Sequence, residues 1–274
     1  MKKILLAFDG VNFSEGAFEF VRCLNEIQPV LVTGVFVAQV DYATLWGYAA
    51  AVEVGAVYYP EVLDEEPEIL QNIERFEHLC QINGISYRIH KNFLDPAIPE
   101  LKKETRFADV VIFSGELFYK GVILNNHFAY LKGALHATEC PVLIVPENYE
   151  FPDNNILAYD GSEASVFAIK QFAYVFPELA KNKTLLVYTD DKEDSDFPAK
   201  ENVIELATQH FKDLTLHKIG SDSKKYFGSW VGNEKGSILV SGSFGRSGIS
   251  EIFKKSFVAD IIKDHKVPVF IAHK

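Results

Sequence analysis

The sequence has little of several features that would narrow its function at once. It contains 3 cysteines in 274 residues, Cys23, Cys80 and Cys140, too far apart to form a metal-binding pair. Scattered, odd-numbered cysteines are typical of a reducing compartment, so we expect a cytoplasmic protein whose thiols pack as small apolar side chains. The 8 histidines show no metal-binding spacing either.

Positive charge and long apolar runs are also scarce. The 27 Lys and Arg residues stand against 38 Asp and Glu residues, which gives a net charge of −11. Because nucleic-acid backbones favour basic surfaces, we expect no nucleic-acid partner. The most apolar long segment, 42–59, is interrupted by Glu53 and two glycines, so we expect no membrane-spanning helix and no membrane partner.

What the chain does contain is an alternation of strand and helix patterns. Short apolar runs predict strands at 3–8, 30–38, 86–90, 110–114 and 142–145, and again at 156–159, 184–189, 214–219, 237–241 and 267–272. Helical spacing of apolar residues predicts helices after Ser14, over 65–82, from 95 to 101, near 124–137, through 168–175, over 199–211 and from 252 to 262. This order is typical of a mostly parallel sheet with helices on both faces.

The two halves of the chain repeat one another. Asp9-Gly10 and Asp160-Gly161 both end a first strand, while Ser114-Gly115 recurs as Ser241-Gly242, 127 residues later. Pro141-Val142 recurs at the same offset. The polar segment 146–154, with two prolines, is the expected linker, which predicts domains at 1–146 and 154–274. The first copy has 24 extra residues between its Asp and its Gly, and we place them in the aromatic segment 39–64.

The stretch 238–257 is the most informative part of the sequence. A short apolar run is followed by Gly242, Gly245 and Gly248 and then by a helical pattern. A strand, a glycine loop and a helix place backbone N–H groups around a phosphate, and glycine lets the backbone approach the anion closely. The alternative is a glycine-rich turn that connects the strand to the helix and binds no ligand. Asp160 and Gly242 both follow strands of the predicted sheet, at the edge where ligands bind in such folds, which favours a site.

This stretch resembles the phosphate loop of the universal stress protein family, which is Gly-x-x-Gly, nine residues, then Gly-Ser/Thr. Gly242, Gly245 and Ser256 fit that pattern, while Lys255 replaces its glycine. Together with the Asp-Gly strand ends and the Pro-Val closing strands, the resemblance extends to both halves, so the chain resembles a tandem member of the family. It implies two Rossmann-like units, each a mostly parallel five-stranded sheet, packed as a pseudo-dimer.

The resemblance also implies a site for ATP or a related adenine nucleotide, ADP or AMP, with or without Mg²⁺. Asp160, with Ala158 and Tyr159 beside it, would line the adenosine pocket, and Thr189 would offer backbone groups to the base. Gly242 and Gly245 would wrap the phosphates, with Arg246 adding positive charge, and Ser256 would donate to them. Lys255 would either neutralise a phosphate or obstruct the loop. These nine residues are the candidate nucleotide-binding site, without a catalytic residue or metal ligand of their own.

The first copy departs further from the pattern. Gly115-Glu116-Leu117-Phe118 stands where Gly242-Ser-Phe-Gly245 stands in the second copy, so a bulky ring replaces the second glycine and a carboxylate is added. We therefore expect the first half to have lost phosphate binding. Its aromatic segment 39–64 could be a lid, a buried loop or an interface between the halves or between chains, and we favour the interface.

Three functions follow from these residues. The first is a nucleotide-binding sensor or regulator of stress responses, without efficient turnover because no general base stands out near Ser256. The second is a nucleotide-free interaction or scaffold protein, with a protein partner or a homodimer, if Lys255 blocks the site. The third is a slow ATP hydrolase.

Overall fold

The chain folds into two halves that contribute strands to one sheet. The computed structural model describes residues 1–8, 11–37, 60–92, 97–117, 133–189, 196–219, 223–242, 261–262, 264 and 266–272. The first half provides strands β1 (Lys2–Phe8), β2 (Val30–Val37), β3 (Ser86–Asn92), β4 (Val110–Ser114) and β5 (Val142–Val145). The second half provides β6 (Asn154–Tyr159), β7 (Lys183–Thr189), β8 (Leu214–Ile219), β9 (Ser237–Gly242) and β10 (Val269–Ala272).

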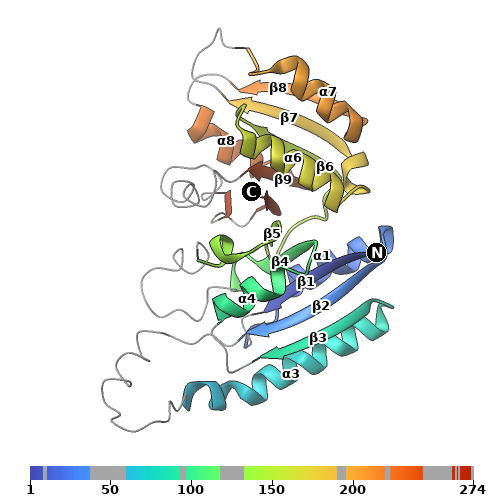
Figure 1. Ribbon diagram of the computed structural model, residues 1–274, viewed down its shortest axis with the longest axis vertical. Helices are drawn as coiled ribbons and strands as arrows, with labels where there is room; N and C mark the ends of the chain where they lie inside the picture. The colour runs from blue at the N-terminus through green and yellow to red at the C-terminus, as the bar shows by residue number, and fades with distance from the viewer. Residues whose placement is uncertain are drawn as a thin grey trace, which may run out of the picture.

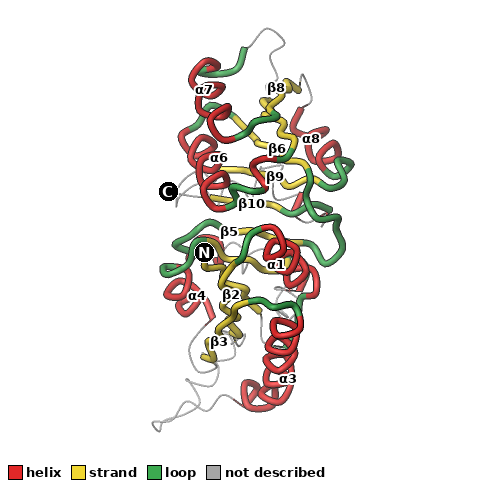
Figure 2. The backbone as a smooth tube through the Cα atoms, turned by 90° about the vertical axis from the view of Figure 1, so that its right-hand side faces the viewer, coloured by secondary structure: helices red, strands yellow, loops and turns green. Residues whose placement is uncertain are grey.

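These strands form a 10-stranded sheet in the order β3-β2-β1-β4-β5-β10-β9-β6-β7-β8. Within each half the paired strands are parallel. The halves meet where β5 and β10 pair antiparallel, with Phe270 opposite Leu143. Figure 2 shows these two strands side by side at the middle of the molecule, and Figure 1 shows the halves extending from it. The expected pseudo-dimer of two Rossmann-like units is confirmed, and pairing covers two strands that would otherwise be open sheet edges.

Helices cover both faces of this sheet. One core cluster joins the sheet to α1 (Glu15–Ile27), α3 (Pro60–Ile82), α6 (Glu163–Val175) and α7 (Lys200–His210). The other joins the opposite face to α4 (Ala97–Thr105), the helical residues 133–137 and α8 (Ser223–Val231). Alternating strand residues supply the two clusters, as the two-residue period of a strand requires. Both faces are buried, which explains the nearly continuous apolar runs of the sequence.

Two helices differ from the sequence-based expectation. The helix expected over 65–82 begins at Pro60, so the end of the aromatic segment belongs to α3. Acidic residues and Pro67 mask its periodicity, whereas Pro60 is well placed as a first helical residue. Helix α8 was not predicted, because its nine residues include Gly228 and are too few to show a clear period. A short 3-10 turn, η2 (Leu179–Lys181), was also missed. The remainder of the segment 39–64 lies outside the described residues.

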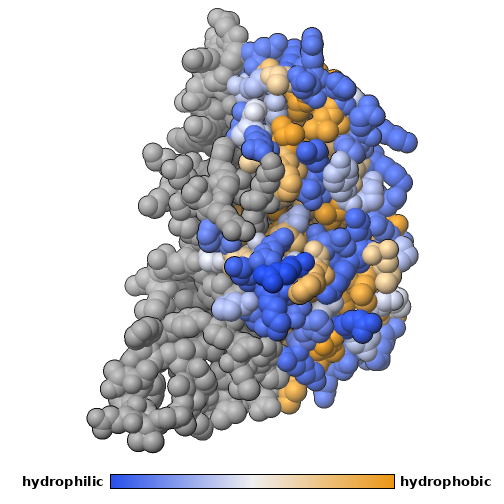
Figure 3. All heavy atoms as spheres, in the orientation of Figure 1, coloured by the Kyte–Doolittle hydropathy of each residue, from blue (hydrophilic) through white to orange (hydrophobic). Residues whose placement is uncertain are grey.

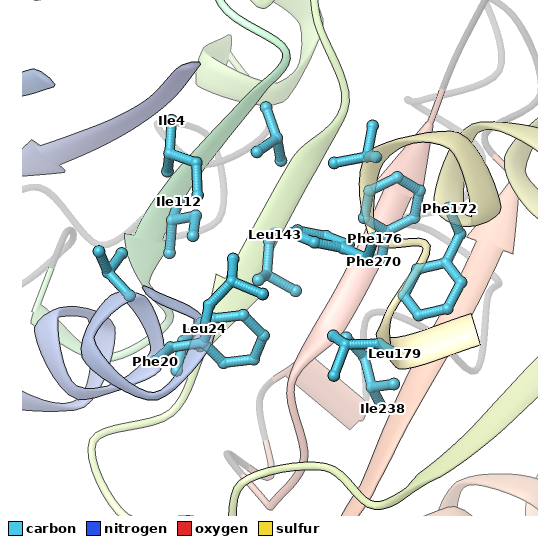
Figure 4. Packing of buried hydrophobic residues seen from close by; sticks show 14 of the residues in the cluster. Ile4, Phe20, Leu24, Ile112, Leu143, Phe172, Phe176, Leu179, Ile238 and Phe270 are labelled. Atoms are coloured by element: carbon cyan, nitrogen blue, oxygen red, sulfur yellow. The ribbon is translucent and has the colours of Figure 1, made fainter. Parts of the chain in front are cut away.

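The core is continuous across the junction between the halves. Phe20, on α1 of the first half, is fully buried, and its ring centroid lies 6.3 Å from that of Phe176 in the second half and 5.1 Å from that of Phe151 in the linker. The side chains of Phe20, Leu143, Phe176 and Phe270 lie together in Figure 4. The two halves therefore bury apolar surface against each other and not only against their own helices.

The described surface is mainly hydrophilic on the face shown in Figure 3, with apolar residues in smaller groups among the polar ones. Among the described residues, no helix combines the length and the apolar character needed to cross a membrane.

Candidate functional site

The carboxyl edge of the second half has the layout of a ligand-binding edge. Strand β6 pairs with β7 on one side and with β9 on the other. The connection after β6 passes through α6 on one face of the sheet, whereas the connection into β9 passes through α8 on the opposite face. The point between β6 and β9 is thus a topological switch point, where open parallel sheets leave a crevice beyond their strand ends.

The first turn of α6 borders this edge. Ser162 caps the helix, and its Oγ accepts a hydrogen bond from the Ser165 N–H at 3.2 Å. The exposed Asp160 carboxylate accepts from the Ser162 N–H at 2.9 Å, which fixes the turn between strand and helix. Asp160 therefore has the turn role that an Asp-Gly pair often has, and one of its oxygens is occupied by the chain itself.

Gly161 and Gly242 are both required by the packing of this edge. Gly161 has a φ of +81°, and a Cβ there would lie 2.6 Å from the Pro198 side chain. A Cβ on Gly242 would lie 2.3 Å from both the carbonyl carbon and oxygen of Ala164 and 2.5 Å from the Ser165 nitrogen. The end of β9 thus runs against the backbone of the first turn of α6, and no side chain fits between them.

Ala158 and Tyr159 do not share a pocket through their side chains. Tyr159 lies in the core cluster beside α6 and α7, whereas Ala158 packs in the cluster on the other face of the sheet. The Tyr159 hydroxyl donates to the Pro198 carbonyl oxygen at 2.6 Å, and burial, reinforced by the charge of Asp160, raises the pKa of Tyr159. Next to it, the rings of Tyr188 and Phe197 lie 5.3 Å apart. Residues 196–199 therefore pack beside the ends of β6 and β7.

Five of the nine residues predicted to bind a nucleotide are among the described residues. Asp160 and Gly242 both contact the first turn of α6, and Thr189 ends the neighbouring strand β7. The remaining predicted site residues lie outside the described residues: Gly245, Arg246, Lys255 and Ser256. The Gly242 backbone and the first turn of α6 approach each other closely without a side chain between them. Tyr159, whose hydroxyl is engaged by Pro198, could serve a nucleotide only with its backbone or ring.

The corresponding edge of the first half is filled by the chain itself. Gly115, the counterpart of Gly242 in the repeat, directly follows β4, and its N–H donates to the Val145 carbonyl oxygen at 2.9 Å. The Glu116 carboxylate accepts from the Glu147 N–H at 3.3 Å, and the Glu147 carboxylate reaches the start of α1. Sequence reasoning missed Glu147, because it lies in the linker and its partners are distant in sequence. Asp9, Gly10 and Phe118 lie outside the described residues.

No group of three or more potential metal ligands occurs within the part of the chain that the structure describes. If Mg²⁺ accompanies a nucleotide, the described side chains offer it no ready cage, and phosphate oxygens and water would have to supply most of its coordination.

The cysteines are unsuited to nucleophilic chemistry. Burial raises the pKa of both the Cys80 and the Cys140 thiols to about 12, and that of Cys23 to about 11. The thiolate is the form of cysteine that reacts with a disulfide reagent such as Ellman's reagent. At pH 7.5 we therefore expect Cys80 and Cys140 to react about a hundredfold or more slowly in the folded protein than in the protein unfolded in guanidinium. Rapid labelling of either residue before denaturation would contradict this expectation.

Comparison with known proteins supports the fold. No protein-family model matches the chain, and no curated protein sequence matches it significantly. Among solved structures, a universal stress protein from Archaeoglobus fulgidus DSM 4304 aligns with 100% of this chain and 96% of its own, with a TM-score of 0.67 and 16% identity. A putative universal stress protein from Pseudomonas aeruginosa UCBPP-PA14 aligns with 99% of this chain and 93% of its own, with a TM-score of 0.52 and 9% identity. The chain therefore has the fold of the universal stress proteins.

Proposed function

We propose that this chain is a tandem universal stress protein that binds one adenine nucleotide, ATP, ADP or AMP, at the carboxyl edge of its second half. It would act as a sensor or regulator in a stress response, and its domains would be 1–146 and 154–274. The observation that carries the proposal is the approach of Gly242, the first glycine of the loop motif, to the first turn of α6 at the switch point. The first half would fold and pair, but not bind nucleotide.

The first test is to identify and count the ligand. Mass spectrometry of small molecules released from the purified full-length chain should find an adenine nucleotide, and calorimetric titration of the stripped protein should give one site per chain. Two equivalent sites would contradict the asymmetry between the halves. Absence of binding would favour the nucleotide-free interaction protein, and steady release of phosphate from ATP above background would favour the slow hydrolase.

Lys255 provides a sharper test, because it replaces the glycine of the family motif. If its ammonium contacts a phosphate, Lys255→Ala should weaken ATP binding by about 1–3 kcal/mol, the range of charge-assisted hydrogen bonds. The loss should be larger for ATP than for adenosine, and added salt should reduce it, because ions screen the contact. Titration calorimetry at two ionic strengths measures both effects.

Lys235 is the matched control for this variant. It is exposed and lies just before β9, at the opposite end of that strand from Gly242, so Lys235→Ala removes the same charge away from the proposed site. It should leave ATP affinity unchanged. Tighter binding by Lys255→Gly, with a partial gain in Lys255→Ala, would show that the side chain obstructs the loop. Unchanged affinity in both Lys255 variants would remove this residue from the site.

A further inference from the structure

Two buried serines of the first half direct their hydroxyl groups at one carboxylate oxygen. Ser14 caps α1 and its Oγ accepts from the Ala17 N–H at 3.0 Å, while Ser114 ends β4 and its Oγ accepts from the N–H groups of Glu116 and Leu117 at 3.2 and 3.1 Å. Each hydroxyl thus has its own proton left to donate. Both protons go to Oε1 of Glu147, and the Ser114 Oγ lies 2.6 Å from that oxygen.

The second carboxylate oxygen of Glu147 meets the start of α1. The Gly16 N–H donates to Oε2 of Glu147 at 3.1 Å. A carboxylate in this position interacts favourably with the unpaired N–H groups and the positive end of the helix dipole. One anionic group therefore receives three hydrogen bonds, two from hydroxyls and one from the backbone, of the kind that charge makes strong.

The backbone around Glu147 packs closely against the start of α1. A Cβ on Gly16 would lie 2.2 Å from the Pro146 carbonyl oxygen and 2.7 Å from the Glu147 Cα, so the linker backbone packs directly on α1. The Tyr149 hydroxyl donates to the Gly16 carbonyl oxygen at 3.1 Å, and the Glu147 N–H donates to the Glu116 carboxylate at 3.3 Å. Contacts on both sides hold the backbone that carries the carboxylate, so its placement does not depend on one flexible side chain.

The elements that Glu147 joins are those that form the candidate site in the second half. It connects the turn that begins at Ser114-Gly115 with the first turn of α1, as Ser241-Gly242 faces the first turn of α6. At the 127-residue offset of the repeat, the sequence has Lys274 in place of Glu147, although Lys274 lies outside the described residues. The carboxylate is therefore a feature of one half only.

We propose that Glu147 is a built-in oxyanion, which occupies the anion position of the first half and holds its α1 and β4 ends closed without a ligand. The carboxylate takes the place that an oxyanion such as phosphate or acetate would take, so that position is unavailable to external anions while Glu147 is present. This proposal does not rest on nucleotide binding by the second half. It predicts that the position becomes available to small anions once the side chain is cut back.

The test is rescue of a truncated variant by an added anion. Glu147→Ala should lower the melting temperature by about 3–8 °C, in line with the loss of several charge-assisted hydrogen bonds in a chain of this size. Sodium acetate or inorganic phosphate at tens of millimolar should restore at least half of that loss, relative to sodium chloride of equal ionic strength. The wild type should shift equally in all three salts, because its site is filled.

Two further variants separate site filling from general effects of charge and salt. Glu150→Ala removes an exposed carboxylate three residues away and should show neither the loss nor the anion-specific recovery. Glu147→Gln keeps the shape but loses the charge, so it should melt about 2–5 °C below the wild type without recovery, because the amide still fills the position. If Glu147→Ala does not fold, the proposal is tested by comparing two glutamine variants. Glu147→Gln should have a lower melting temperature than the wild type, and Glu150→Gln should have the same melting temperature as the wild type. Equal responses of Glu147→Ala and Glu150→Ala to acetate and phosphate, or a Glu147→Gln variant as stable as the wild type, would overturn the proposal.

Discussion

Gly242→Ala is expected to lower the free energy of unfolding by about 3 kcal/mol or more, although it adds a single methyl group. That methyl would lie 2.3 Å from the Ala164 carbonyl carbon and oxygen, well inside the contact distance of these atoms. Because the neighbours are backbone atoms of the first turn of α6, relief requires the helix to move relative to β9, which is the costly form of overpacking. Urea denaturation of the purified variant measures the change.

Gly84→Ala is the control, because it changes the same residue type without crowding. Gly84 has a φ of +62° and an added Cβ would meet nothing within 4 Å. Only the left-handed conformation is penalised there, at about 1–2 kcal/mol. A Gly242→Ala variant no less stable than Gly84→Ala would show that β9 and α6 are less closely packed than the structure indicates. If Gly242→Ala is too unstable to purify while Gly84→Ala folds, the prediction is met in its strongest form.

Gly242 also shows how far the sequence could lead. Its place after a buried strand, and its recurrence at the offset of Gly115, were sufficient to predict a glycine at a ligand-binding edge. The motif suggested that the glycine admits a phosphate. What the structure shows is that the glycine lets the backbone of α6 approach closely, and that contact joins residues almost eighty positions apart. Proximity of this kind leaves no local pattern in a single sequence.

The fold could be predicted from the sequence more completely than the site, for a physical reason. Buried parallel strands leave continuous apolar runs, and a tandem repeat displays them twice, so the strands and the recurrence of Pro141-Val142 as Pro268-Val269 could be predicted. The strand order and the antiparallel pairing of β5 with β10 were not predicted from the sequence. The role of Glu147 could not be predicted either, because its hydroxyl partners lie 133 and 33 residues away. In the sequence, a lone glutamate in a polar linker looks like a solvated residue. Predictions for Lys255 and Ser256 rest on the motif alone.

Phe270→Ala should have a still larger effect, about 3–5 kcal/mol, the usual range for removing a buried aromatic ring. Phe270 is fully buried in β10, and its ring centroid lies 5.3 and 5.8 Å from those of Phe172 and Phe176. Its backbone is opposite Leu143 of the first half. Because the cavity opens at the junction, we expect both halves to lose stability together, although the substitution lies in the second half only.

Each half can be followed by its own probe. In a Trp46→Phe background, Trp230 fluorescence reports on the second half, and the reaction of the buried Cys80 and Cys140 thiols with a disulfide reagent reports on the first. The urea transitions of the two probes should coincide, as expected for one cooperative unit. Adding Phe270→Ala should move both transitions to lower urea by the same amount. Phe107→Ala is the control, because the Phe107 side chain is 65% exposed and should change stability by no more than about 0.5 kcal/mol.

The reason to expect joint unfolding is that neither half can bury its closing strand alone. Separation would expose the paired edges of β5 and β10 and the apolar contacts of Phe20 with Phe176, which belong to one core cluster. Unpaired strand edges and newly exposed aromatic rings both cost free energy, so the loss of one half destabilises the other. If Phe270→Ala shifts the Trp230 transition and leaves the thiol-labelling transition of the first half in place, the halves are independent domains joined by a linker, and the shared sheet contributes little to their stability.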